Sequence, residues 1–147
     1  LFRTTHVDEM LRLGRCLLAA ETQVLMMKDS LEMTDEDRGR IVEACRQAEE
    51  RHVLVTHGTD TMVATARALG QAKLDKTIVL TGAMVPYAFG SSDGLFNLGS
   101  ALAFAQTLPS GAYIAMNGVV FSWDDVRKNL AQGVFERIED RDQTVIP

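Results

Sequence analysis

The chain has 147 residues, of which 46% are hydrophobic and 24% are charged, a composition that is typical of a globular protein and argues against a disordered one. Its formal net charge of -5 argues against a nucleic-acid partner, and no apolar stretch approaches the roughly 20 residues that a membrane-spanning helix needs. We therefore expect one domain, residues 1–147, located in the cytoplasm and without a membrane or nucleic-acid partner.

Apolar spacing divides the chain into alternating helices and strands. In chain order it predicts a helix at 8–19, a strand at 22–27, a helix at 33–50, a strand at 52–56, a helix at 59–70, a strand at 76–80, a helix at 93–108, a strand at 112–117 and, as its hairpin partner, a strand at 118–121. Apolar strands that alternate with helices are typical of a parallel sheet covered by helices. The sequence therefore predicts a three-layer, Rossmann-like α/β fold, in which a mostly parallel sheet of four or more strands carries helices on both faces.

Two helix ends carry their own sequence signals. Thr34 and Asp37, three residues apart, resemble a capping box with Asp in place of Glu, and Gly70 stands where it would end the helix at 59–70. The core-facing side of that helix is predicted to consist of Met62, Ala66 and Leu69.

Two features allow more than one interpretation. Cys16 and Cys45 lie in apolar helical stretches, so we expect packing thiols in a reducing compartment, and a disulfide between them is the alternative. The polar stretch from Asn129 to Pro147 has little pattern and is interpreted either as an arm on a partner or as a frayed end.

Small polar residues follow each of the predicted parallel strands. They are residues 28–32 after the first strand, 57–61 after the second, 81–84 after the third and 117–118 after the fourth. Because ligands bind beyond the carboxyl ends of parallel strands, we expect these residues to line one site. Several of these residues also have a purely structural explanation: Thr59 and Asp60 as helix caps, Ser30 as a turn residue and His57 as a buried structural side chain. Lys128, in the later part of the chain, can likewise be explained as a surface charge.

Signals for cofactors are absent from the sequence. The first strand is not followed by the glycine pattern of a dinucleotide-binding protein, the phosphate-binding loop motif does not occur, and no histidines and cysteines have the spacing of a zinc site. We therefore expect neither a cofactor nor a metal.

Several segments resemble the bacterial-type L-asparaginase family. They are HGTDTM at 57–62, KTIVLTGAMVP at 76–86, SSDGLFNL at 91–98, MNGVVFSWDDVRKN at 116–129, and DSLEMTDED at 29–37, which resembles the substrate-carboxylate loop of the cytoplasmic members. The resemblance implies hydrolysis of a small amide, such as asparagine, to an acid and ammonia.

The resemblance also assigns roles to individual residues. It implies that Thr59, Asp60 and Lys128 are catalytic, because a threonine hydroxyl becomes a nucleophile when a base such as lysine removes its proton. Asp60 would orient the lysine or hold the amino group of the substrate. The substrate-binding residues that it implies are Ser30 for the α-carboxylate, Gly58, and Ala83, whose backbone lines the amide end.

The expected arrangement of these residues is specific. We predict that Ser30, Thr59, Asp60 and Ala83 line one pocket, and that the Lys128 ammonium lies within hydrogen-bonding reach of Asp60 or Thr59.

Three features of the family are absent from this sequence. They are an early T-G-G-T-like motif with another threonine, the tyrosine of the lid that follows it, and the smaller C-terminal domain; Leu31 also stands where family members carry a polar residue. We therefore expect that an N-terminal strand is missing and that the chain alone is slow or inactive. The alternatives are a non-catalytic small-molecule-binding or regulatory module that keeps the pocket, and an α/β domain whose motifs only cap helices.

The partners that we expect are a small amide or amino-acid substrate and further copies of the same chain. Family members assemble, and the predicted helix at 93–108 carries Phe96, Leu102 and Phe104, more apolar surface than contact with one sheet needs. We therefore expect a homodimer with two-fold symmetry or a higher homo-oligomer.

Overall fold

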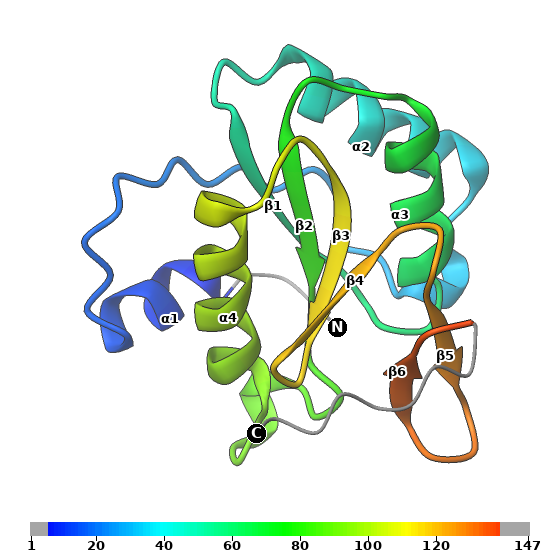
Figure 1. Ribbon diagram of the computed structural model, residues 1–147. Coiled ribbons are helices and arrows are strands. Elements are labelled where there is room, and N and C mark those ends of the chain that lie inside the picture. The colour runs from blue at the N-terminus through cyan, green and yellow to red at the C-terminus, as the bar shows by residue number, and fades with distance from the viewer. Residues whose placement is uncertain (1–5, 139–147) are drawn as a thin grey trace, which may run out of the picture.

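The computed structural model describes residues 6–138, and its elements alternate between helices and strands for most of the chain (Figure 1). In chain order they are α1 (Val7–Leu13), the 3-10 helix η1 (Ser30–Glu32), α2 (Asp35–Gln47), β1 (His52–Thr56), α3 (Met62–Gln71), β2 (Thr77–Thr81), the 3-10 helix η2 (Tyr87–Phe89), α4 (Gly94–Thr107), β3 (Gly111–Met116), β4 (Val119–Ser122), β5 (Arg127–Asn129) and β6 (Val134–Glu136).

The main sheet has four strands in the order β1-β2-β3-β4. β1, β2 and β3 run parallel, with Thr56 opposite Thr81, and β4 returns antiparallel to β3 as the predicted hairpin. α2 and α3 cover one face of the sheet, and α4, with α1 beside it, covers the other (Figure 1). The expected three-layer α/β fold is therefore confirmed.

The two faces of β2 explain why its sequence is apolar throughout. All five of its residues are buried. Ile78 and Leu80 pack in the core beneath α2 and α3, whereas Val79 packs against Ala101 and Ala105 of α4. Side chains alternate between the faces of a strand, so a strand covered on both sides needs an apolar residue at every position.

The N-terminal expectations need two corrections. The helix expected at 8–19 ends at Leu13, because Arg15 has a left-handed φ of 52° and the N–H groups of Arg15 and Cys16 close the end on Arg12 O and Leu11 O. This pair of bonds is a Schellman motif, which terminates a helix. Leu17, which lies within the stretch expected to be helical, is outside α1 and fully exposed.

The apolar run at 22–27 is not a strand. Within residues 6–138, β1 pairs with β2 alone, and this run joins no sheet. Leu25 and Met26 instead pack in an irregular segment against the core beneath α2 and α3, and Arg40 of α2 donates a hydrogen bond to Leu25 O. Leu25 and Met26 therefore cover the core without extending the sheet, whereas Val24 and Met27 of the same run are exposed.

The helix signals were correct at α2 and partly wrong at α3. Thr34 and Asp37 form the predicted capping box at the start of α2, and the predicted inner face of α3 is buried. Gly70, expected to end the helix, lies inside it, and α3 ends at Gln71. A Cβ at Gly70 would lie 2.2 Å from Cδ2 of the Trp123 indole, so this glycine allows close packing and does not end the helix.

The C-terminal part of the described chain contains an element that the sequence analysis missed. The stretch that was expected to form an arm or a frayed end, 129–147, contains the last residue of β5 and all of β6, which pair as a hairpin. Phe135 is buried in the core, and Gly133, with φ 65°, donates its N–H to Asn129 O to close the turn. The rest of that predicted tail, residues 139–147, lies outside the described residues.

The two cysteines are free thiols. Cys45 is buried in the core, where burial raises its pKa to about 11, and this agrees with the expected packing role. Cys16 is partly exposed in the turn after α1. None of the helices found between residues 6 and 138 combines the length and apolarity needed to cross a membrane.

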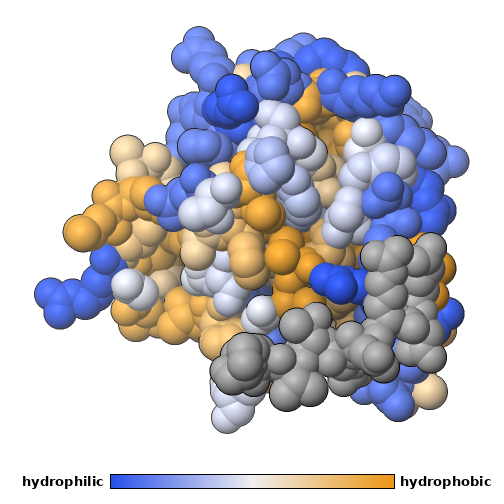
Figure 2. Space-filling view, in the orientation of Figure 1, coloured by the Kyte–Doolittle hydropathy of each residue, from blue (hydrophilic) through white to orange (hydrophobic). Residues whose placement is uncertain are grey.

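Hydrophobic side chains gather on the surface over α1 and α4 (Figure 2). The large exposed ones in these elements and the turn after α1 are Leu13, Leu17, Leu18, Leu95 and Phe96. The expected homo-oligomer stays a prediction. Because Phe96 is exposed on this surface, we expect the subunit interface to form here.

Candidate active site

The candidate site lies at the carboxyl ends of the parallel strands. The turns after β1, β2 and β3 meet at this edge because neighbouring parallel strands end together. Two further segments reach the same edge: η1, which brings Ser30, and β5, which brings Lys128.

Lys128 connects the two central residues of the site. Its Nζ donates hydrogen bonds to Thr59 Oγ1 at 2.9 Å and to Asp60 Oδ1 at 2.7 Å. The lysine side chain is 11% exposed and the Asp60 side chain 42% exposed, so the ion pair has one partner that is mostly covered and one that faces solvent. Both hydrogen bonds agree with the predicted geometry.

Thr59 and Asp60 do not serve as helix caps. α3 begins after Thr61, and no side chain caps its first turn. The Thr61 hydroxyl instead donates to Ser30 O at 2.6 Å. The structural explanation offered for Thr59 and Asp60 is therefore wrong, and their side chains are left to meet Lys128.

Ser30 holds the other side of the same turn. Its side chain is buried, and its Oγ accepts a hydrogen bond from Asp60 N at 3.2 Å. Gly58 passes so close that a Cβ there would lie 2.8 Å from Ser30 Cβ. Glycine is therefore required at 58 for the turn and η1 to touch.

Lys28 and Asp37 fix the segment that carries Ser30. Lys28 Nζ binds Asp37 Oδ2 at 2.8 Å, and the same oxygen accepts Thr34 N at 3.0 Å. These bonds lower the pKa of Asp37 from 3.8 to about 2, the bond from Lys28 contributing most. The carboxylate thus ties the loop before α2 to the first turn of that helix.

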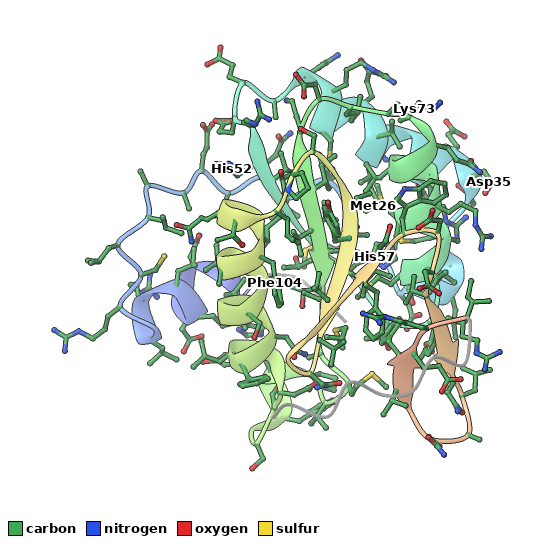
Figure 3. All side chains as sticks on the ribbon, viewed as in Figure 1. Met26, Asp35, His52, His57, Lys73 and Phe104 are labelled. Atoms are coloured by element: carbon green, nitrogen blue, oxygen red, sulfur yellow. The ribbon has the colours of Figure 1, made fainter. Side chains whose placement is uncertain are left out.

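His57 braces the turn from within. The ring lies between the sheet and α3 (Figure 3), with Nδ1 2.6 Å from Gly58 O and Nε2 2.8 Å from Thr65 Oγ1. Because a carbonyl can only accept, Nδ1 carries the proton, and the neutral ring accepts the Thr65 hydroxyl at Nε2. Burial lowers the pKa of His57, which favours this neutral form. The geometry agrees with a structural histidine.

The Asp93 side chain binds the turn after β2 through hydrogen bonds. Its Oδ2 accepts Met84 N at 3.1 Å and its Oδ1 accepts Val85 N at 3.0 Å, while Asn97 and Asn117 both donate their side-chain amides to Oδ2 at 3.0 Å. Burial by itself would raise the pKa of Asp93, but these hydrogen bonds outweigh it and lower the pKa. Asp93 occupies the N-cap position of α4, but its side chain binds the loop and does not cap the helix.

The structure brings most of the predicted site residues together. Direct contacts join Ser30, Gly58, Asp60, Thr59 and Lys128. Ala83 follows β2 at the same edge, and its neighbour Gly82 packs against His57 O. That all of these residues line one pocket stays a prediction.

Sequence reasoning missed Thr65 and Asn97, whereas Asn117 was expected at this edge as one of the residues that follow the fourth predicted strand. Asn97 is fully buried on the inner face of an otherwise apolar α4, four residues after Asp93. A polar residue on an apolar helix face, one turn from an acid, was the available signal, because a buried amide needs partners.

The chemical groups at this edge suit a small polar ligand. A hydroxyl, an ammonium and a carboxylate lie in contact, and the backbone N–H of Asp60 donates to Ser30 Oγ beside them. Among residues 6–138, no group of three or more His, Cys, Asp or Glu side chains could hold a metal ion.

The fold and this edge define an α/β protein with a polar site at the carboxyl ends of its parallel strands. The family model described as "Asparaginase, N-terminal" matches residues 4–140. The chain therefore belongs to the asparaginase family.

Solved and curated relatives agree with this assignment. L-asparaginase 2 of Escherichia coli (strain K12) is 43% identical over 79 residues, which are 51% of this chain and 23% of that protein. The thermostable L-asparaginase from Thermococcus kodakarensis superposes with a TM-score of 0.80 at 31% identity, over 89% of this chain and 43% of that chain. A probable cytoplasmic L-asparaginase from Campylobacter jejuni also gives 0.80, at 30% identity, over 91% and 45%. The chain spans less than half the length of these relatives.

Proposed function

We propose that this chain forms the catalytic part of an amidohydrolase resembling L-asparaginase, which converts a small amide such as asparagine to the acid and ammonia. The observation that carries the proposal is the contact of Lys128 Nζ with both Thr59 Oγ1 and Asp60 Oδ1. The L-asparaginases among its relatives support the same reaction, and the similarity to a probable cytoplasmic L-asparaginase from Campylobacter jejuni supports a cytoplasmic location.

In the proposed reaction, Thr59 is the nucleophile and Lys128 moves its proton. The Thr59 oxygen attacks the amide carbon while the Lys128 ammonium gives one proton to the leaving nitrogen and takes up the proton of the Thr59 hydroxyl. Ammonia departs and an ester to Thr59 remains. Water attacks that ester, gives a proton to Lys128, and releases the acid as Thr59 regains its hydrogen.

The remaining residues would bind the substrate. Ser30 would hold the α-carboxylate, Asp60 would hold the α-amino group while it orients Lys128, and Gly58 would leave room for both. The backbone of Ala83 would lie at the amide end. The close packing of Gly58 on Ser30 supports this division, because it brings the two binding segments within contact distance.

Ammonia release tests the proposal. Asparagine, glutamine and simple amides are offered to this chain and to a longer form that carries a T-G-G-T-like segment ahead of residue 1, and we expect the longer form to be faster. Thr59→Ala should lower the rate by at least about a hundredfold. Thr107→Ala, which removes an exposed hydroxyl bonded to its own helix, is the matched control and should keep the rate.

Two outcomes would overturn parts of the proposal. If neither form releases ammonia but asparagine binds, the protein is a small-molecule-binding or regulatory module. If Thr59→Ala leaves a measurable rate unchanged, the hydrolase class survives and the role given to Thr59 is wrong.

A further inference from the structure

The strands that carry Lys128 to the site form a small sheet of their own. β5 and β6 pair with each other beside the main sheet (Figure 1), and each strand has three residues. A two-stranded hairpin is at best marginally stable by itself. The position of Lys128 therefore depends on the contacts that side chains make on the two faces of this hairpin.

The two faces of the hairpin carry different side chains. Lys128 lies opposite Phe135 across the pair, and residues that lie directly opposite share a face. Phe135 is buried in the core, so this inner face, with Lys128 on it, points toward the body of the protein. The neighbours of Lys128 in β5 are Arg127 and Asn129, whose side chains point to the outer face. Glu136 lies opposite Arg127 and shares that outer face.

One carboxylate joins the side chains of the outer face. Glu136 Oε1 accepts a hydrogen bond from Arg127 Nε at 2.9 Å, and Glu136 Oε2 accepts one from Asn129 Nδ2 at 3.4 Å. Asn129 Oδ1 in turn accepts Gln132 N at 3.1 Å in the turn between the strands. A rotation of β5 that turned Lys128 outward would move both of its neighbours inward, and it would therefore break both bonds to Glu136.

We propose that Glu136 is a positioning residue, which binds the two neighbours of Lys128 on the outer face of the hairpin and thereby keeps the Lys128 ammonium on Thr59 and Asp60. Glu136 acts only through Lys128, because its carboxylate lies on the opposite face of the strand pair. The effect on the reaction rests on the proposed function, to which the inference adds a residue outside the site that fixes the orientation of the lysine.

Chemical labelling of lysines tests this geometry without relying on catalysis. Acetic anhydride acetylates accessible free amines, and mass spectrometry gives the rate at each lysine, which here are Lys128 and the reference residues Lys28, Lys73 and Lys76. Lys128 is mostly covered, and its ammonium is bonded to two oxygens. We therefore expect it to react when the hairpin opens, so that its rate reports the population of the open form.

The expected effect is selective for Lys128. Glu136→Ala removes both bonds on the outer face, and because Arg127 is 59% exposed, the change should be that of an exposed ion pair: Lys128 should react about threefold to fivefold faster. Glu136→Gln keeps one acceptor oxygen and should raise the rate less. The rates at Lys28 and Lys76, which bind Asp37 and Ala48 O, should stay unchanged, whereas a general loss of the fold would raise them too.

Glu43→Ala is the matched control. Glu43 in α2 also binds one guanidinium and one side-chain amide, those of Arg46 and Gln47, and its side chain is exposed. The substitution removes the same kinds of bond far from the hairpin in sequence, so the Lys128 rate should not change. If Glu136→Ala leaves the Lys128 rate unchanged, or raises the rates of all lysines to the same extent, the inference is wrong.

Ammonia release from asparagine separates the inference from the proposed function. A displacement of 1 Å at a reacting group can cost about a hundredfold, so the looser hairpin of Glu136→Ala should lower kcat at least about threefold. KM should stay unchanged, because Lys128 acts on the reacting atoms, and Glu43→Ala should keep both constants. If an active form keeps its kcat in Glu136→Ala, the inference fails and the proposed function stands. If the Lys128 rate rises as expected but no form hydrolyses an amide, the proposed function fails and the positioning of Lys128 by Glu136 stands.

Discussion

Replacing Gly58 with alanine tests the packing between the nucleophile turn and η1. The new Cβ would lie 2.8 Å from Ser30 Cβ and 2.9 Å from Ser30 Oγ. Carbon atoms in ordinary contact are about 3.5–4.0 Å apart, so the two segments must separate by at least about 0.7 Å. Ser30 cannot simply rotate away, because it is buried and bonded to Asp60 N and Thr61 Oγ1.

The magnitude follows from this forced separation. Overpacking of this kind costs about 1–3 kcal/mol, which corresponds to a fall in Tm of roughly 3–9 °C for a chain of this size. The 3.2 Å bond from Asp60 N to Ser30 Oγ is also lost when the segments part. Urea unfolding followed by circular dichroism measures the free energy of unfolding directly.

Two further variants separate this clash from the general effect of alanine. Gly39 lies in α2 with nothing within 4 Å of a new Cβ, so Gly39→Ala should stabilise by about 0.5–1 kcal/mol. Ser30→Gly removes the two nearest atoms, so in that background Gly58→Ala should cost less than half as much. If Gly58→Ala is as stable as the original chain, or costs the same in both backgrounds, the argument is refuted.

Three other perturbations have expected outcomes. Lys128→Met should lower the rate of ammonia release at least about a hundredfold, and an unchanged rate would contradict the role given to Lys128. The same substitution should change the free energy of unfolding by less than about 1 kcal/mol, because its partner Asp60 is 42% exposed and can be hydrated. The pKa of Asp37 is lowered from 3.8 to about 2, so its stabilisation is complete above 3.8 and is lost as the pH falls through 2. Urea unfolding across this pH interval should show a smaller loss of the free energy of unfolding for Asp37→Asn than for the original chain. Equal losses in the two proteins would count against the bond to Lys28. Gly70→Ala should destabilise by about 1–3 kcal/mol because its Cβ meets the Trp123 ring, whereas Gly99→Ala, with open space, should not; tryptophan fluorescence during unfolding compares them.

The layer arrangement could be predicted because its signals are local. The alternation of apolar strands with amphipathic helices indicates a sheet that is buried on both faces. The Thr34–Asp37 pair indicates directly where a helix starts. The run at 22–27 was wrongly predicted as a strand because a short apolar stretch does not itself determine pairing, and only Leu25 and Met26 of it pack against the core. Whether it pairs with a strand depends on neighbours that are distant in sequence, as the contact of Leu25 with Arg40 shows.

The site was predictable to the extent that its residues follow strands or carry a recognisable motif. Thr59 and Asp60 follow β1, and Lys128 was found only through the resemblance, since a lone lysine has no pattern of its own. The network of Asp93 and Asn97 was missed because Asp93 before a helix has a sufficient local explanation as a cap. Its actual partners are backbone groups of a loop, and no side-chain pattern identifies those.

Lys128 and Thr59 are 69 residues apart in sequence and are brought together by a hairpin that lies outside the main sheet. Closing so long a loop has an entropic cost that is not offset by contacts between residues close in sequence. We therefore expect the contact between Lys128 and Thr59 to form late in folding. The strands and helices between the two residues can assemble while the hairpin of β5 and β6 is still undocked. Refolding of this chain should therefore restore its secondary structure in an earlier phase than its contact between ammonium and hydroxyl, and chemical competence should be the last property to return.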